Sequence, residues 1–117
     1  MDLIQIYQCF CEANRLRILH LLTQGPLCVC HFQDILRIPQ AKVSQHLAYL
    51  RKHRMVETTR RGNWVIYRLP DRRPAELEKN LRCLQDCARE DKRFRDDLKR
   101  QRKITARCQW LESSACC

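Results

Sequence analysis

Hydrophobic residues recur every three or four positions over much of the chain, a spacing typical of amphipathic helices. In one segment the apolar face is formed by Val29, Phe32, Ile35 and Leu36. In the next it is formed by Val43, Leu47 and Leu50. Pro39 lies between them and suits a helix start, because it lacks a backbone donor. Two short helices joined by a tight turn predict a helix-turn-helix, whose second helix enters the DNA major groove.

The remaining positions of the second helix are polar and fit contacts with DNA. Side chains of these types hydrogen-bond base edges and phosphates. We expect the groove contacts to come from Gln40, Lys42, Ser44, Gln45 and His46. A helical hairpin with a solvated polar face has the same pattern, so charge and context must separate the two interpretations.

Further apolar segments predict helices on both sides of this motif. Residues 2–10 and 14–23 have helical spacing, and the second is apolar nearly all round, which predicts a central core helix. We expect His20 in the core rather than as a metal ligand. From Ala75 a long helix carries one apolar stripe, typical of an interface with a second copy. The stripe consists of Leu77, Leu81, Leu84 and Ala88, extended less regularly by Phe94 and Leu98.

Two short segments after the helix-turn-helix predict a β-hairpin. Residues 56–60 and 64–69 are rich in β-branched and aromatic residues, and Gly62 lies in the turn between them. A basic hairpin at this place is a wing, and its contacts with phosphates or a minor groove are expected from Arg60, Arg61 and Asn63. A ribbon that only packs on the core is the alternative.

The predicted fold is mainly α with a small β-hairpin: a dimeric winged helix-turn-helix with a long C-terminal helix. We assign residues 1–87 to a DNA-binding and dimerisation domain. Residues 88–117 are assigned to a charged, cysteine-containing C-terminal extension, and residues 89–107 are expected to be solvated.

Charge strengthens the DNA-binding interpretation. The 117 residues suffice for one domain and carry 23 Lys and Arg against 13 Asp and Glu, a net charge of +10. Residues 37–61 hold seven of these basic residues and one acid. Such a surface favours a polyanion, because neutralised phosphates release counterions. RNA and acidic membrane surfaces are compatible with charge alone.

Other function classes receive less support. The chain has no run of eighteen apolar residues and no signal-peptide pattern at its start, so we expect a cytoplasmic protein without a membrane partner. A glycine-rich phosphate loop and a carboxylate pair in a plausible pocket are also missing from the sequence. We therefore do not expect an enzyme.

Four ordered blocks of the chain resemble the ArsR/SmtB family of winged-helix metal-sensing repressors, and its arsenic-responsive members most. The blocks are NRLRIL at 14–19, LCVC at 27–30, KVSQHL at 42–47 with LR at 50–51, and GNWVIYRL at 62–69. The resemblance covers roughly residues 6–69. It implies a homodimer that represses at operator DNA near its own promoter and is released when As(III) or Sb(III) binds cysteine thiolates.

The chain departs from this family pattern at three positions. Gln33 stands where the arsenic-responsive pattern often has a third cysteine, Pro39 where a polar helix cap is usual, and Arg54 where glycine often precedes the wing. The first departure leaves the set of metalloid ligands incomplete. The other two concern only the local conformation of a helix start and of the turn before the wing.

Cys28 and Cys30 are the expected metalloid ligands, since soft As(III) favours thiolate. On an ideal helix their side chains diverge by about 200°. One ion would then bind both only by unwinding the first turn, which would misplace the recognition helix. The helix N-terminus is expected to favour the thiolate forms. The third ligand is open among Cys83, Cys87, Cys108, Cys116, Cys117, Cys9, Cys11 and an external thiol.

The nine cysteines leave other signals open. Within the same fold the inducer can be cadmium, lead or zinc, which prefer four ligands, and His31 directly follows Cys30. A thiol-redox sensor using Cys28 and Cys30, or Cys116 and Cys117, is a second alternative. From another class, the chain can be a basic metal-binding interaction module.

Overall fold

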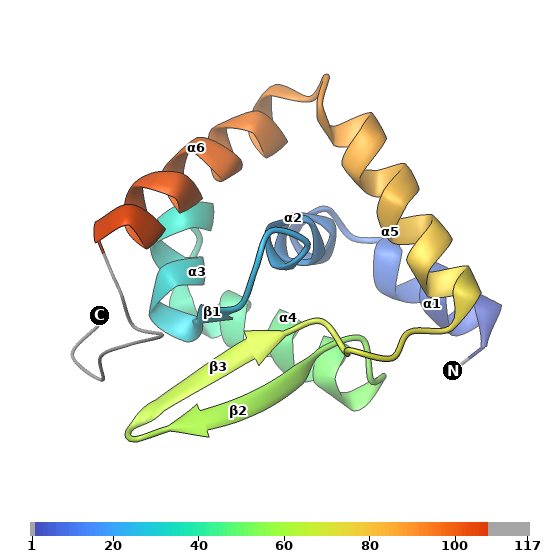
Figure 1. The fold of residues 1–117 in the computed structure, drawn as a ribbon, viewed down its shortest axis with the longest axis horizontal. Helices are drawn as coiled ribbons and strands as arrows, with labels where there is room; N and C mark the ends of the chain where they lie inside the picture. Colours follow the sequence, from blue (N-terminus) through green and yellow to red (C-terminus); the bar gives the residue numbers. More distant parts are fainter. Residues whose placement is uncertain (1, 108–117) are drawn as a thin grey trace.

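The computed structural model describes residues 2–107, which form six helices and a small sheet (Figure 1). The elements of the N-terminal half are α1 (Leu3–Phe10), α2 (Ala13–Leu22), β1 (Leu27–Cys28), α3 (Val29–Leu36) and α4 (Gln40–Lys52). Those of the C-terminal half are β2 (Glu57–Arg61), β3 (Trp64–Arg68), α5 (Ala75–Ala88) and α6 (Lys92–Arg107). Cys108, Cys116 and Cys117 lie outside the described residues.

Helices α3 and α4 form the expected helix-turn-helix. The carbonyl of Pro39 accepts hydrogen bonds from the amides of Lys42 and Val43, so the proline caps α4 through its backbone. The apolar face of α4 is fully buried, and its members are Val43, Leu47 and Leu50. This face packs into the core around α2, which leaves the polar face of α4 at the surface.

Two arginines adopt the left-handed conformation that glycine usually supplies. Arg37 ends α3 with φ 57°, and Arg54 follows α4 with φ 61°. After Arg54, the amide of Met55 donates to the carbonyl of Leu50 at 2.9 Å, which satisfies one of the last carbonyls of α4. The side chain of Met55 is fully buried. Burial and this hydrogen bond therefore hold a turn that the sequence at Arg54 disfavours.

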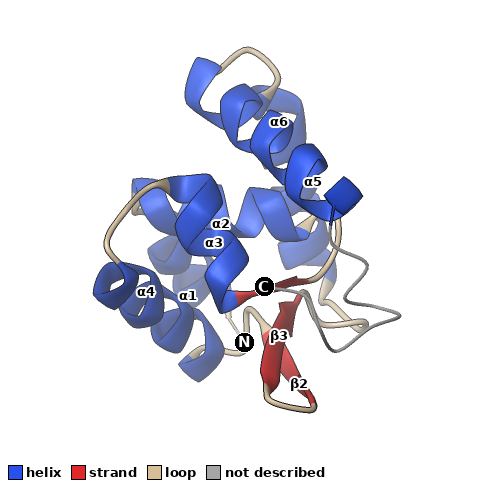
Figure 2. Cartoon of the chain, turned by 90° about the vertical axis from the view of Figure 1, so that its left-hand side faces the viewer, coloured by secondary structure: helices blue, strands red, loops and turns tan. Residues whose placement is uncertain are grey.

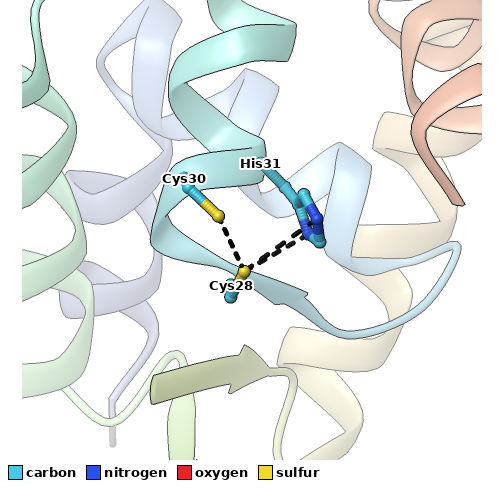
Figure 3. A group of neighbouring side chains, drawn as sticks. All are labelled: Cys28, Cys30 and His31. Carbon is cyan, nitrogen blue, oxygen red and sulfur yellow. Dashed lines mark hydrogen bonds between the residues drawn. The ribbon is translucent and has the colours of Figure 1, made fainter. Parts of the chain in front are cut away.

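The wing is present, and a third strand joins it (Figure 2). Strands β2 and β3 pair up to Arg61 and Trp64, leaving a two-residue turn in which Gly62 has φ 61°. The sequence pattern missed β1, because two residues are too few for an alternating pattern. Strand β1 pairs Cys28 with Ile66 of β3, so Cys28 lies between the wing and α3 (Figure 3).

The expected long C-terminal helix is present as α6, but a break after Ala88 separates it from α5, and α6 folds back over α2 and α3 (Figure 1). Asp91 caps α6 by accepting from the amides of Arg93 and Phe94. The expectation that residues 89–107 are solvated is wrong, because Phe94, Asp97 and Gln101 are buried. The boundary between residues 87 and 88 stays a prediction.

The apolar stripe of α5 belongs to the core of the chain itself. Leu77, Leu81 and Ala88 are buried against the chain's own elements, and Leu84 packs at the edge of the core. The stripe therefore leaves no free interface for a second copy, and a dimer must use another face.

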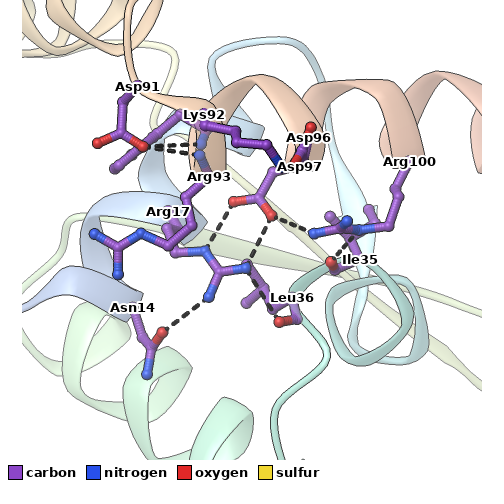
Figure 4. A network of polar contacts seen from close by, with 11 residues as sticks. Asn14, Arg17, Ile35, Leu36, Asp91, Lys92, Arg93, Asp96, Asp97 and Arg100 are labelled. Atoms are coloured by element: carbon purple, nitrogen blue, oxygen red, sulfur yellow. Dashed lines mark hydrogen bonds and ion pairs between the residues drawn. The ribbon is translucent and has the colours of Figure 1, made fainter.

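A buried ion pair fastens α6 to the helix-turn-helix (Figure 4). Arg17 of α2 donates from Nε and Nη2 to both carboxylate oxygens of Asp97, at 2.8 and 2.9 Å, and Asp97 is 0% exposed. The same Nη2 donates to the carbonyl of Leu36 at 3.1 Å. Arg100 donates to Asp97 at 2.9 Å and to the carbonyl of Ile35 at 2.7 Å. The last carbonyls of α3 are thus held from α2 and α6.

His20 lies in the core beside this network, as expected. Its ring packs edge-on against Phe94 at 5.3 Å between ring centroids, and its Nδ1 has no hydrogen-bond partner among the described residues. Burial lowers the pKa of His20 below its ordinary 6.5, although the nearby Asp97 carboxylate acts in the opposite direction. The imidazole is therefore neutral near pH 7.

Replacing Asp97 by Asn should strongly destabilise the fold. The substitution leaves Arg17 buried without a counter-charge, and losing one partner of a buried pair costs about 3–5 kcal/mol. Chemical denaturation monitored by circular dichroism measures the free energy of unfolding. Asp96→Asn, which removes the exposed partner of Lys92, is the matched control and should have little effect. Equal losses in the two variants would contradict a structural role for the buried pair.

Lowering the pH should reduce the free energy of unfolding because of His20. Below pH 6.5 His20 in the unfolded chain takes up a proton, whereas buried His20 in the folded chain does not. The free energy of unfolding therefore decreases as the pH is lowered, until the pKa of the folded state is reached. One such group contributes a slope of at most about 1.4 kcal/mol per pH unit. His20→Phe keeps an aromatic ring beside Phe94 and should make the loss between pH 7 and pH 5 smaller. Parallel stability–pH curves for the variant and the natural chain would refute this assignment.

Candidate thiol site and nucleic-acid interface

The structure brings the two expected thiol ligands together (Figure 3). The sulfur atoms of Cys28 and Cys30 lie 3.0 Å apart. Cys28 has extended backbone, φ −92° and ψ 165°, because it ends β1 and caps α3, whereas Cys30 lies in the first helical turn. The expected divergence of about 200° is wrong, since it assumed that both residues are helical. One ion can therefore contact both sulfurs without unwinding α3.

His31 adds a nitrogen donor to this pair. Its Nδ1 lies 3.5 Å from the sulfur of Cys28, and its side chain is buried at 3% exposure. The ligand atoms of Cys28, Cys30 and His31 all lie within 4.8 Å of one another. Between residues 2 and 107 no other group of three such donors forms. The sequence offered a signal for His31, because it directly follows the Cys-x-Cys pair, but the pair alone was assigned as ligands.

Burial controls the protonation of this site. It raises the pKa of the Cys28 thiol, although hydrogen bonds from the backbone of His31 and Cys30 act in the opposite direction. Burial also lowers the pKa of His31, with Asp34 opposing it. The amides at the start of α3 lower the pKa of Cys28 as expected, but burial has the larger effect and raises it. A bound cation has to displace the thiol proton, so binding releases protons.

The other described cysteines lie apart from this group. Cys9 is fully buried in the core, where burial raises the pKa of its thiol, and Cys11 is exposed at the end of α1. Cys83 and Cys87, two of the candidates for the third ligand, are exposed on α5 and point away from its leucine stripe.

Four of the five candidate groove residues are exposed on one helix. Gln40, Lys42, Ser44 and Gln45 present their side chains to solvent from α4. His46 is different: it is half-buried, and its Nε2 lies 3.6 Å from the carboxylate of Glu12, the residue that caps α2. The wing residues Arg60, Arg61 and Asn63 are exposed at the tip of the hairpin.

Arg15, which the sequence analysis did not single out, fixes the position of α4. Its guanidinium lies 4.2 Å from the ring centroid of Tyr49 on α4 and donates to the carbonyls of Gln8 and Cys9 on α1. The ring of His53, the C-cap residue of α4, packs against the ring of Tyr49 itself, at 4.5 Å between centroids. A cation stacked on an aromatic face is attracted to it, so α1, α2 and α4 are joined at this point.

The helices between residues 2 and 107 include none that is long and apolar enough to cross a membrane.

Comparison with known proteins agrees with this architecture. The model of the family "Bacterial regulatory protein, arsR family" matches residues 12–58, from the cap of α2 to the second residue of β2. The arsenic resistance transcriptional regulator ArsR1 of Pseudomonas putida is 34% identical over 86 residues, 73% of this chain and 67% of that protein. The arsenical resistance operon repressor of Escherichia coli is 38% identical over 88 residues, 71% and 75% of the two chains.

A solved structure shares the fold. HlyU from Vibrio cholerae superimposes with a TM-score of 0.65 at 27% identity, over 72% of this chain and 88% of that one. The matched family, the arsenic-resistance relatives and the helix-turn-helix with its wing agree with one another. The chain belongs to the arsR family of bacterial regulatory proteins and is a DNA-binding, metalloregulatory transcriptional repressor with a winged helix-turn-helix fold.

Proposed function

We propose that this repressor binds operator DNA as a homodimer and is released when As(III) or Sb(III) binds the thiolates of Cys28 and Cys30. The observation that carries the proposal is the 3.0 Å separation of the two sulfur atoms at the start of α3. Arsenic and antimony in this state are soft, and thiolates are the soft ligands that proteins offer. The arsenic-resistance relatives support the same inducer.

The position of the pair supplies a route from inducer to DNA. Cys28 is paired with Ile66 in the wing strand β3, while Cys30 belongs to α3. An ion that draws the two sulfurs into its coordination geometry shifts β1 against the first turn of α3. The far end of α3 is held by Arg17 and Arg100, so the shift passes to β1 and to the wing strand β3 with which it pairs. This route replaces the unwinding of α3 that the sequence suggested.

Operator contact is proposed for the polar face of α4 and the tip of the wing. In the groove we place Gln40, Lys42, Ser44, Gln45 and His46, and along the backbone or minor groove Arg60, Arg61 and Asn63. His46 reaches a base only after its side chain leaves Glu12. The basic residues of this face supply the attraction to phosphate.

The proposed dimer uses the exposed face of α1. Leu3, Ile4 and Tyr7 are 49%, 72% and 51% exposed, which is unusual for large apolar side chains on one short helix. Leu3 and Tyr7 line a surface hollow together with α5, whose contribution is Glu76, Lys79 and Asn80. A second copy that docks there removes this apolar surface from water.

A soft divalent ion is the second candidate inducer, and His31 is the observation that favours it. Zinc and cadmium bind imidazole together with thiolates, whereas As(III) favours sulfur. His31→Ala separates the two candidates. Arsenite should still release this variant from operator DNA, whereas cadmium or zinc should no longer do so. As a third ligand for arsenic, a further thiol is the chemically consistent donor.

Replacing both cysteines, Cys28→Ser with Cys30→Ser, should leave operator binding intact and abolish release. The physical reason is that the thiols face each other and α3 rather than the proposed DNA-binding face. Fluorescence anisotropy of reduced protein on its own upstream DNA, with arsenite, antimonite, cadmium or zinc added, measures both effects. The expected coupling between inducer and DNA is about 1–3 kcal/mol or more. Release of the double variant by arsenite would show that the site is elsewhere, and Cys11→Ser is the matched thiol control.

Gln45→Ala should reduce operator affinity in a sequence-dependent way. An amide that pairs with a base edge contributes about 1–3 kcal/mol of discrimination, so preference at one base position should relax. Competition assays with single-base operator variants measure this preference. Gln85→Ala, on α5, is the control and should leave affinity unchanged. A uniform loss over all sequences would make Gln45 a backbone-positioning residue instead.

A further inference from the structure

Helix α5 carries a second pair of thiols, which the proposed release mechanism does not use. Cys83 and Cys87 are four residues apart, and their sulfur atoms lie 3.9 Å from each other. Both side chains are exposed, and both cysteines are free. In contrast to Cys9, they contribute nothing to the core. Two adjacent, accessible sulfurs on a regular helix form a preorganised bidentate donor.

The separation of the two sulfurs fits one soft centre. Bonds of about 2.3 Å from a soft centre to sulfur, at angles between pyramidal and tetrahedral, place two thiolates about 3.5–3.8 Å apart. The observed 3.9 Å needs only a small rotation of the side chains. Residues at i and i+4 face the same side of a helix, so the backbone already holds the pair in this register.

The number of donors restricts the ligand. Among residues 2–107, the one group of three possible metal ligands is at Cys28, Cys30 and His31, so Cys83 and Cys87 have no third donor within reach. The nearby carboxylate of Asp86 is paired with Arg89 at 3.6 Å. Zinc takes four ligands, and a fully thiol-bound inorganic As(III) takes three. A pair of thiols instead suits a soft atom that has two ligands to exchange for thiolates and keeps its remaining bond.

We propose that Cys83 and Cys87 bind a monosubstituted trivalent arsenical, R–As(OH)2, as a second thiol site. Two As–O bonds break and two As–S bonds form, while the thiol protons leave with the hydroxyl groups as two molecules of water. Arsenic stays trivalent and the As–R bond is kept, so no oxidant or reductant takes part. The arsenical is neutral, and so is the thiol of Cys87 at neutral pH, because its pKa is raised by the hydrogen bond with Cys83.

The second site is independent of the first in sequence and in structure. Cys28 and Cys30 lie at the junction of β1 and α3, whereas Cys83 and Cys87 lie on α5 (Figure 1). They also lie about one to two helical turns beyond Asn80, the end of the hollow proposed for the second copy. The proposal holds whether or not the first pair governs release from DNA.

The test is the binding of phenylarsine oxide to the reduced protein, followed by native mass spectrometry and peptide mapping. The background variant removes competing thiols by substituting serine at Cys28, Cys30, Cys108, Cys116 and Cys117. We expect one phenylarsenic group per chain, linked to Cys83 and Cys87, that resists excess glutathione. Adding Cys87→Ser should lower the apparent affinity about 100-fold, because the second bond is intramolecular.

A register-shifted variant is the matched control. Cys87→Ser combined with Gln85→Cys keeps the number of thiols but places them about 200° apart around the helix. It should bind as weakly as Cys87→Ser alone, and circular dichroism should show an unchanged helical fold. Retention of the adduct in either variant, or no adduct in the background protein, would overturn the proposal. Equal affinity for inorganic arsenite would overturn the ligand class.

The background variant lacks Cys28 and Cys30, so its result is separate from operator release. Failure to bind phenylarsine oxide would contradict the α5 site but not the proposed release mechanism. Failure of arsenite to release the natural protein from DNA would contradict the release mechanism but not the α5 site.

Discussion

The buried pair of Arg17 and Asp97 is the interaction on which the arrangement of the helices depends. It joins α2, at the centre of the core, to α6, which comes 80 residues later in the chain. Because a buried charge without a partner is costly, α6 can dock only where Asp97 meets Arg17. Arg17 and Arg100 then use their remaining donors on the carbonyls of Leu36 and Ile35. One carboxylate thereby sets the positions of three helices.

The ion pair also determines which end of α3 can move when a ligand binds the proposed thiol site. The C-terminal end of α3 is fixed by charged hydrogen bonds, while its N-terminal end carries Cys30 and meets Cys28 of β1. Because the C-terminal end of α3 is held, a displacement at the thiol pair moves the N-terminal end of α3 and the adjoining β1. Strand β1 is only two residues long and pairs with the wing, so the same displacement reaches the hairpin. The wing, one of the two parts that contact DNA in the proposed function, is therefore a neighbour of the proposed sensor.

The two thiol pairs differ in the environment that sets their chemistry. Cys28 is buried beside His31, and burial raises the pKa of its thiol, so a ligand that binds the thiolate has to displace a proton. Cys83 and Cys87 are exposed and have no third donor among the described residues. In the two proposals, donor number and burial, rather than the presence of sulfur, distinguish the ligands of the two pairs.

The sequence by itself determined the helix-turn-helix and the wing. Val43, Leu47 and Leu50 repeat with the helical period, and Gly62 lies between two β-rich segments, so local spacing and turn chemistry suffice. Cys28 and Cys30 were likewise found as a candidate pair from their spacing. In each case the signal lies within a few neighbouring residues.

Tertiary structure alone decided how distant segments meet. The approach of the two sulfurs depends on β1, which exists only because Leu27 and Cys28 pair with Tyr67 and Ile66 of the distant strand β3. The docking of α6 on α2 depends on the pairing of Asp97 with Arg17, which the periodicity of α5 and α6 does not predict. Helical spacing reports which side of a helix is apolar. Which element covers that side is set by packing and charge pairing across the whole chain.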